Sequence, residues 1–263
     1  MQRSDGRRQD EVRPLRVVYD MYEYASGSVL YEIGKTKVLC AVSLQPGVPR
    51  FLRGCKTGWL TAHYAMLPTS TPKRIEREIN LGKKNGRYVE ISRLIGRSLR
   101  SVLQLDAIPD RTINIDCDIL QADGGTRTAC ITAAYMALKQ AEQRWFANGT
   151  IEQPLVKHDV AAISVGVLNG VPVLDPNFAE DNTADGDFNF VITRSGSFIE
   201  VQGTAEKAPL SPDILYEMYA LAAQGVKQLF VSLEDKKQPT KQKQGLFTLS
   251  KRLKSASQNS ESL

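Results

Sequence analysis

One segment combines the residue types and the spacing that a phosphate-binding site needs. Residues 111–119 alternate apolar and polar side chains, which predicts a half-buried strand, and the sequence DGGTR follows at 123–127. Glycines let the backbone approach an anion, N–H groups at a helix N-terminus point toward it, and Thr126 and Arg127 add further donors. The alternative is a tight strand-to-helix turn in which the threonine only caps the helix. Local chemistry leaves both interpretations open.

A second segment concentrates acidic side chains. Five of them occur between positions 175 and 187: Asp175, Glu180, Asp181, Asp185 and Asp187. Like charges packed together repel one another, so the cluster is either a solvated loop or a cation site. Composition alone favours the loop.

The net charge of +5 conceals an uneven distribution along the 263 residues. Residues 1–100 carry 19 Lys and Arg against 9 Asp and Glu, residues 101–235 carry 8 against 19, and residues 236–263 carry 7 against 1. Such asymmetry suits a protein that binds a polyanion with one region and holds a cation with another. Complementary subunit faces in an oligomer would explain it equally well, and the two explanations are compatible.

Composition also argues against several classes of protein. The sequence has no run of about 18 apolar residues that could span a bilayer. Its N-terminus is rich in Arg and Asp where a signal peptide needs an apolar stretch, so we expect a cytoplasmic protein. The four cysteines form no C-x-x-C pair, and two histidines offer little to complete a zinc site, so we expect neither structural zinc nor a disulfide framework.

The elements that must position these residues are mixed strands and helices. Residues 27–43 predict a hairpin that turns at 34–36. Further strands are expected at 160–168, 171–174, 188–193 and 198–202. Helical spacing covers about 89–105, a segment from 124 through 138, and a segment that begins at Ser211-Pro212. These elements favour an α+β fold, with one folded domain over 1–235 and a basic, mobile tail over 236–263.

Six blocks of sequence follow one another in a fixed order. They are RSDGRRQDEVRPLR (3–16), GVPRFLRG (47–54), GWLTAHYAMLP (58–68), GRYVEISRLIGRSLR (86–100), INIDCDILQADGGTRTACIT (113–132) and IEVQGTAE (199–206). These blocks are similar to those of the bacterial RNase PH family, and together they are far more specific than a lone motif. The resemblance implies a single RNase PH-type domain, of the ribosomal protein S5 domain 2-like kind, with a mixed sheet and packed helices.

The resemblance implies an activity and assigns residues to it. The activity is a nucleotidyltransferase reaction in which inorganic phosphate, in place of water, shortens the 3′ end of precursor tRNA, and of rRNA as a further substrate, and releases nucleoside 5′-diphosphates reversibly. The residues that match the family's phosphate site are Arg87, Gly125, Thr126 and Arg127. Asp181 and Asp187 match an acid pair near the phosphate that would hold Mg²⁺ or Mn²⁺ and, with Arg127, carry catalysis. Asp185 is a third acid that the sequence does not exclude.

The basic segment 73–84 (KRIEREINLGKK) acquires a role only through the same resemblance. Charge runs are usually solvated faces. In the family this segment contacts tRNA, and the RNA-binding residues it implies here are Arg74, Arg77, Lys83 and Lys84. A third arginine of the family falls at Thr69, so one contact is missing.

Two questions of assembly and activity depend on the family as well. The family forms a hexameric ring, a trimer of dimers, which implies a homohexamer here. The alternative to an enzyme is a catalytically silent RNA-binding ring subunit. Silent relatives lose the phosphate arginines or the acid pair, whereas this sequence retains Arg87, Arg127, Asp181 and Asp187.

Overall fold

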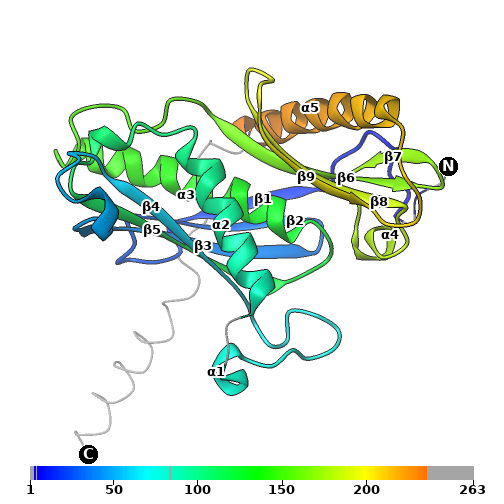
Figure 1. Ribbon diagram of the computed structural model, residues 1–263, viewed down its shortest axis with the longest axis horizontal. Coiled ribbons are helices and arrows are strands. Elements are labelled where there is room, and N and C mark those ends of the chain that lie inside the picture. The colour runs from blue at the N-terminus through cyan, green and yellow to red at the C-terminus, as the bar shows by residue number, and fades with distance from the viewer. Residues whose placement is uncertain (1–2, 4, 83–84, 236–263) are drawn as a thin grey trace, which may run out of the picture.

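The computed structural model describes residue 3, residues 5–82 and residues 85–235. In that part of the chain, two sheets pack with helices between and outside them (Figure 1). The α+β fold with a mixed sheet and packed helices is therefore confirmed. The predicted tail over 236–263 lies outside the described residues, as do Lys83 and Lys84.

The larger sheet is mixed. Its strands are β1 (Leu15–Tyr19), β2 (Gly27–Ile33), β3 (Thr36–Pro46), β4 (Trp59–Met66) and β5 (Arg111–Gln121), in the order β1-β2-β3-β5-β4. Neighbours are antiparallel except β4 and β5, which run parallel. The hairpin expected at 27–43 is β2 and β3. The strand expected at 111–119 is β5, and its apolar face is buried as the alternation predicts.

The smaller sheet is antiparallel. Its strands are β6 (Val160–Leu168), β7 (Val171–Leu174), β8 (Gly186–Thr193) and β9 (Phe198–Ala205), in the order β7-β6-β8-β9. All four contain the strands that the sequence predicted. Every residue of β6 is buried because α3 (Thr126–Ala147) and α5 (Pro212–Asp235) both pack on this central strand.

The helix α3 lies between the two sheets, where it contacts β2, β3 and β6 (Figure 1). It begins in the predicted region but continues to Ala147 and is buried on nearly every side. The other elements are α1 (Glu78–Leu81), α2 (Gly86–Arg100), α4 (Phe178–Asp181) and short 3₁₀ turns at Arg50–Leu52 and Leu105–Ala107. None of the described helices has both the length and the apolar composition needed to cross a membrane.

The first long helix has different ends from those expected. Apolar spacing predicts a helix over about 89–105, whereas α2 spans 86–100. It begins earlier because the side chain of Asn85 accepts a hydrogen bond from the Arg87 N–H at 3.0 Å. It ends earlier because the next residues pair with another segment, where Gln104 N–H donates to the Leu155 carbonyl at 2.7 Å and Leu103 bridges to Val156.

The contact between β2 and α3 leaves no room for a side chain at Gly27. A Cβ there would lie 2.1 Å from the Ala137 carbonyl oxygen, which is backbone of α3. We expect Gly27→Ala to lower the free energy of unfolding by about 1 to 3 kcal/mol, because the helix must shift. Gly86→Ala is the control, since a Cβ there meets nothing within 4 Å. Denaturant unfolding of both variants tests this packing, and equal stabilities would contradict it.

Candidate active site

The turn that joins β5 to α3 presents backbone donors at a helix N-terminus. Gly124 and Gly125 have positive φ angles of 76° and 62°, and Gly125 is the N-cap of α3. A Cβ on Gly124 would lie 2.6 Å from the Pro176 carbonyl oxygen, so the position requires glycine. The first N–H groups of a helix have no partner within it, and the dipole of this 22-residue helix favours an anion at that end. The Thr126 hydroxyl is also at the turn, 3.2 Å from the Tyr64 hydroxyl.

Two side chains from the start of the chain fix this turn. Arg13 donates hydrogen bonds to the carbonyl oxygens of Asp123 and Gly124. The Thr36 hydroxyl accepts from the Asp123 N–H at 2.9 Å and donates to the Gly124 carbonyl at 2.8 Å. Sequence reasoning assigned neither residue a role, because nothing in the local pattern around either one points to a turn about 90 residues or more away.

The two arginines of the predicted phosphate site each occupy the second position of a helix. Arg127 Nη2 lies 3.1 Å from a carboxylate oxygen of Glu90, whose other oxygen accepts a hydrogen bond from Gln202 at 2.8 Å. Burial alone would raise the pKa of Glu90, but the contacts with Gln202 and Arg127, together with the nearby Arg87, hold that pKa below its usual value. The Nε of Arg127 is buried and has no hydrogen-bond partner among the described residues. A donor is therefore left for a ligand.

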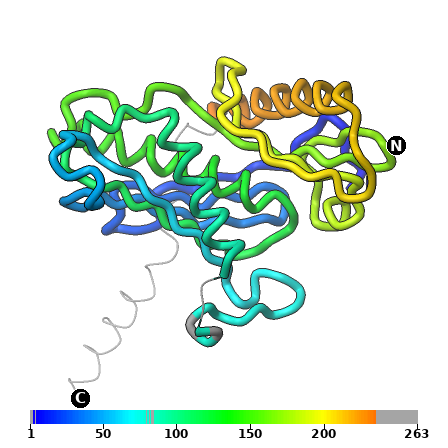
Figure 2. The backbone as a smooth tube through the Cα atoms, viewed as in Figure 1, coloured from blue at the N-terminus to red at the C-terminus, as the bar shows by residue number. Residues whose placement is uncertain are grey.

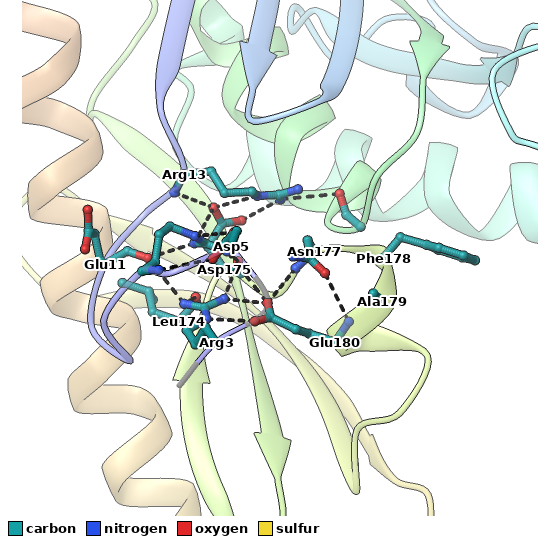
Figure 3. A network of polar contacts seen from close by, with 12 residues as sticks. Arg3, Asp5, Glu11, Arg13, Leu174, Asp175, Asn177, Phe178, Ala179 and Glu180 are labelled. Atoms are coloured by element: carbon teal, nitrogen blue, oxygen red, sulfur yellow. Dashed lines mark hydrogen bonds and ion pairs between the residues drawn. The ribbon is translucent and has the colours of Figure 1, made fainter. Parts of the chain in front are cut away.

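A buried ion-pair network holds two of the five clustered acids (Figure 3). The fully buried side chain of Arg3 donates to both oxygens of Glu180, at 2.9 and 2.7 Å. Arg13 donates in the same way to both oxygens of Asp175, at 2.9 and 2.6 Å. Glu180 also completes a capping box with Asn177 at the start of α4. The N-terminal segment thus fixes α4 and the loop before it.

A third acid of the cluster is paired on the protein surface. Asp185 lies 2.9 Å from the ammonium of Lys207 and also accepts a hydrogen bond from the Gly170 N–H at 2.9 Å. The hydrogen bond from Lys207 lowers its pKa. Asp185 therefore has a counter-ion of its own, which separates it from the acid pair that the sequence could not distinguish from it.

Asp181 and Asp187 are the two acids without a counter-ion. Within the described ranges, no Lys or Arg lies at ion-pair distance from either. Burial and the neighbouring Asp181 raise the pKa of Asp187 to about 6, and burial and Glu206 raise the pKa of Asp181. Arg127 acts on both carboxyl groups in the opposite direction. The structure therefore brings the predicted acids and the predicted phosphate arginine into one electrostatic neighbourhood.

The two carboxylates of Asp181 and Asp187 fit a divalent cation that takes few protein ligands. No group of three or more His, Cys, Asp or Glu side chains in the described part of the chain is arranged to hold a metal ion. Mg²⁺ and Mn²⁺ need fewer protein ligands than that, because they retain waters and bind one or two carboxylates together with substrate phosphate. The unpaired Asp181 and Asp187 fit that mode of binding.

A chain of buried hydrogen bonds connects the turn to the acids. Thr128 Oγ1 donates to the Gly125 carbonyl at 3.0 Å and lies 3.2 Å from the Ser164 hydroxyl. Ser164 donates to Asn189 at 2.9 Å, and the Asn189 amide donates to Asp187 at 3.4 Å. Sequence reasoning missed these supporting residues, since each contributes one short polar side chain from a different element.

The two described arginines of the basic segment are exposed. Arg74 and Arg77 are exposed on the connection between β4 and α2, which extends away from the body of the protein (Figures 1 and 2). Their side chains are therefore accessible to a large ligand.

The raised pKa of Asp187 gives a pH-dependent stability. An acid whose pKa is higher in the folded state binds more protons when folded, so stability falls as pH rises from about 4 to about 6 and stays reduced above that. We expect Asp187→Asn to raise the melting temperature of the metal-free protein at pH 7.5 by about 2 °C or more, and to have little effect at pH 4. Asp185→Asn, which removes a lowered pKa, should not stabilise the protein. An Asp187→Asn effect that does not change with pH would contradict the assignment.

The comparisons with known proteins agree with this geometry. Residues 11–143 match domain 1 of the 3′ exoribonuclease family, RNase_PH, and residues 158–225 match domain 2 of that family. Rice (Oryza sativa) Rrp46 is similar in structure, with a TM-score of 0.71 and 22% identity over 88% of this chain and 98% of that chain.

Two exosome structures are similar as well. An Archaeoglobus fulgidus exosome with RNA bound to the active site matches with a TM-score of 0.75 and 20% identity over 88% of this chain and 92% of that chain. An archaeal exosome core matches with a TM-score of 0.70 and 19% identity over 89% and 91%. These likenesses show a shared fold and do not separate bacterial RNase PH from exosome subunits. With matches to both of its domains, the chain belongs to the 3′ exoribonuclease family, RNase PH.

Proposed function

We propose that this chain is a phosphate-dependent 3′-to-5′ exoribonuclease of the bacterial RNase PH kind, which trims precursor tRNA and rRNA. One observation carries the proposal. Near the start of a long helix, Arg127 has a buried Nε without a hydrogen-bond partner among the described residues, and it lies in the electrostatic neighbourhood of two carboxylates that have no counter-ion in that part of the chain. An anion site beside a cation site suits the attack of phosphate on a phosphodiester.

In this proposal the anion site holds the attacking phosphate. Its ligands are the guanidinium groups of Arg87 and Arg127, the Thr126 hydroxyl and the N–H groups that follow Gly125. An oxygen of the phosphate forms a bond to the phosphorus of the last phosphodiester, and the bond from that phosphorus to the 3′-oxygen of the penultimate nucleotide breaks. The 3′-oxygen takes up a proton, and a nucleoside 5′-diphosphate leaves. A phosphodiester bond is exchanged for the phosphoanhydride bond of the diphosphate, which is of similar energy, so the reverse reaction adds nucleotides.

The acid pair supplies the cation site. Asp181 and Asp187 would hold Mg²⁺ or Mn²⁺, and the cation, when bound, offsets negative charge on the scissile phosphate and the departing oxygen. Asn189 orients the carboxylate of Asp187 through its hydrogen bond. No general base is required, because phosphate at neutral pH is already a competent nucleophile.

The alternative is a catalytically silent subunit of an RNA-binding ring. The similarity to rice Rrp46 and to exosome cores favours it. The joint presence of both arginines and both unpaired acids favours the enzyme, since a silent subunit needs neither an anion site nor a cation site. We extend the proposal to a homohexamer, a trimer of dimers, on the grounds of the sequence resemblance, and to a cytoplasmic location on the grounds of composition.

One incubation distinguishes these possibilities. RNA with a 3′ extension is treated with and without phosphate, and we expect nucleoside diphosphates only when phosphate is present. Arg127→Ala should lower that activity by at least about 100-fold while RNA affinity stays nearly unchanged, because the side chain faces the small anion. Arg144→Ala, at the other end of α3, is the matched control. Binding of RNA without diphosphate release would identify a silent subunit, and release of monophosphates without phosphate would identify a hydrolase.

The basic segment between β4 and α2 gives a separate prediction about substrate. The double variant Arg74→Ala, Arg77→Ala removes two exposed charges, so activity on precursor tRNA should fall while activity on a short single-stranded oligonucleotide falls much less. The salt dependence of tRNA binding should become shallower by about 0.7 to 0.9 per lost phosphate contact. Equal losses on both substrates with an unchanged slope would mean that these arginines do not contact tRNA.

A further inference from the structure

Phe178 places an exposed aromatic ring beside the candidate active site. It is the first residue of α4, one turn before Asp181, and 53% of it is exposed. In the described part of the chain, its ring makes no aromatic or cation–π contact. Figure 3 shows the ring directed away from the buried ion-pair network on which α4 is held. A single exposed apolar side chain is common on protein surfaces, so its surroundings must decide whether it has a role.

The backbone of Phe178 is held against the turn that joins β5 to α3 at residues 122–125, here called the phosphate turn. The Phe178 N–H donates to Asp123 Oδ1 at 3.4 Å, and a Cβ on Gly124 would lie 3.0 Å from the Phe178 nitrogen. On the other side, the capping box and the salt bridge from Arg3 hold Glu180. These contacts therefore fix α4, and they hold the Phe178 backbone between the phosphate turn and Asp181.

We propose that Phe178 is a stacking platform for the base of the 3′-terminal nucleotide of RNA. This inference rests on the proposed function, which places the last phosphodiester between the phosphate turn and Asp181. The base attached to that nucleotide presents a flat face to its surroundings, and Phe178 carries an exposed aromatic ring on a backbone that adjoins both the turn and Asp181. Every base has such a face, so stacking accepts all four in turn, as the removal of successive nucleotides requires.

The test combines a change in the protein with a change in the RNA. Phe178→Ala should lower kcat/KM on intact RNA about tenfold, which corresponds to about 1.4 kcal/mol and lies within the range of base–aromatic stacking. On RNA that lacks only the base of its 3′-terminal nucleotide, the kcat/KM of the unmodified protein should be lower by about the same factor. Phe178→Ala should lose nothing further on that RNA, because the two changes remove one contact. Phe178→Trp should retain activity on intact RNA.

Phe146→Ala is the matched control. Phe146 is also a partly exposed phenylalanine, with 44% exposure, but it lies near the end of α3, about 30 Å from Thr126 at 1.5 Å per residue. This variant should behave like the unmodified protein on both RNAs. A further loss for Phe178→Ala on the abasic RNA, or unchanged activity on intact RNA, would overturn the inference.

A binding measurement separates this inference from the proposed function. Without phosphate, RNA that ends in 2-aminopurine should lose more fluorescence on binding the unmodified protein than on binding Phe178→Ala, because stacking quenches that base. If no diphosphates form with phosphate but the quenching depends on Phe178, the proposed function fails and the stacking platform stands. If diphosphates form and the quenching is the same in both proteins, the proposed function stands and the platform is wrong.

Discussion

The ion pair between Arg13 and Asp175 joins the two sheets at the place where the candidate active site lies. Arg13 comes just before β1 of the larger sheet, and Asp175 comes just after β7 of the smaller one. The same guanidinium donates to the carbonyls of Asp123 and Gly124, so one buried charge orients both the phosphate turn and the loop that leads to Asp181. Loss of either partner would leave the other buried charge with only a longer ion pair, from Arg7 to Asp175 at 3.7 Å or from Arg13 to Asp123 at 4.0 Å, which destabilises more than loss of a surface pair. The proposed site has an anion half at the phosphate turn and a cation half at Asp181 and Asp187, and the distance between them depends on this contact.

Local sequence patterns located the elements that carry the site, because alternation, glycine pairs and capping residues act over a few positions. They could not identify which acids keep a free carboxylate. Asp185 and Asp187 are two residues apart in the sequence, yet Asp185 pairs with Lys207, whereas Asp187 is partly buried and feels the charge of Arg127 without an ion pair to it among the described residues. That distinction arises from partners that lie 22 and 60 positions away along the chain.

Local patterns also fail to report contacts between distant segments, which explains why the predicted helix extended to 105 although α2 ends at Arg100. It also explains why some residues acquired a predicted role only through the family resemblance. Apolar spacing continues to Leu105, but the N–H of Gln104 pairs with Leu155, which no helical pattern reveals. Arg87 as an isolated arginine before a helix has no local signal at all. Its electrostatic interaction with Asp181 appears only when α2 and α4 are placed together.

The helices α2 and α3 carry the two arginines of the predicted phosphate site, each as the second residue of its helix. The strands β4 and β5 run parallel and so end at the same edge of the larger sheet, and α2 packs against both β4 and α3. The helix α3 begins five residues after β5 ends, whereas α2 follows β4 only after a connection that includes α1. Arg87 and Arg127 both act electrostatically on Glu90 and Asp181, and together they form the proposed anion half of the site. The acids come from the smaller sheet, so the two halves can be aligned only if the sheets keep a fixed relation. The burial of α3 between them supplies that relation, since residues 128–138 of this helix are all buried between the sheets, while its N-terminus remains at the candidate site.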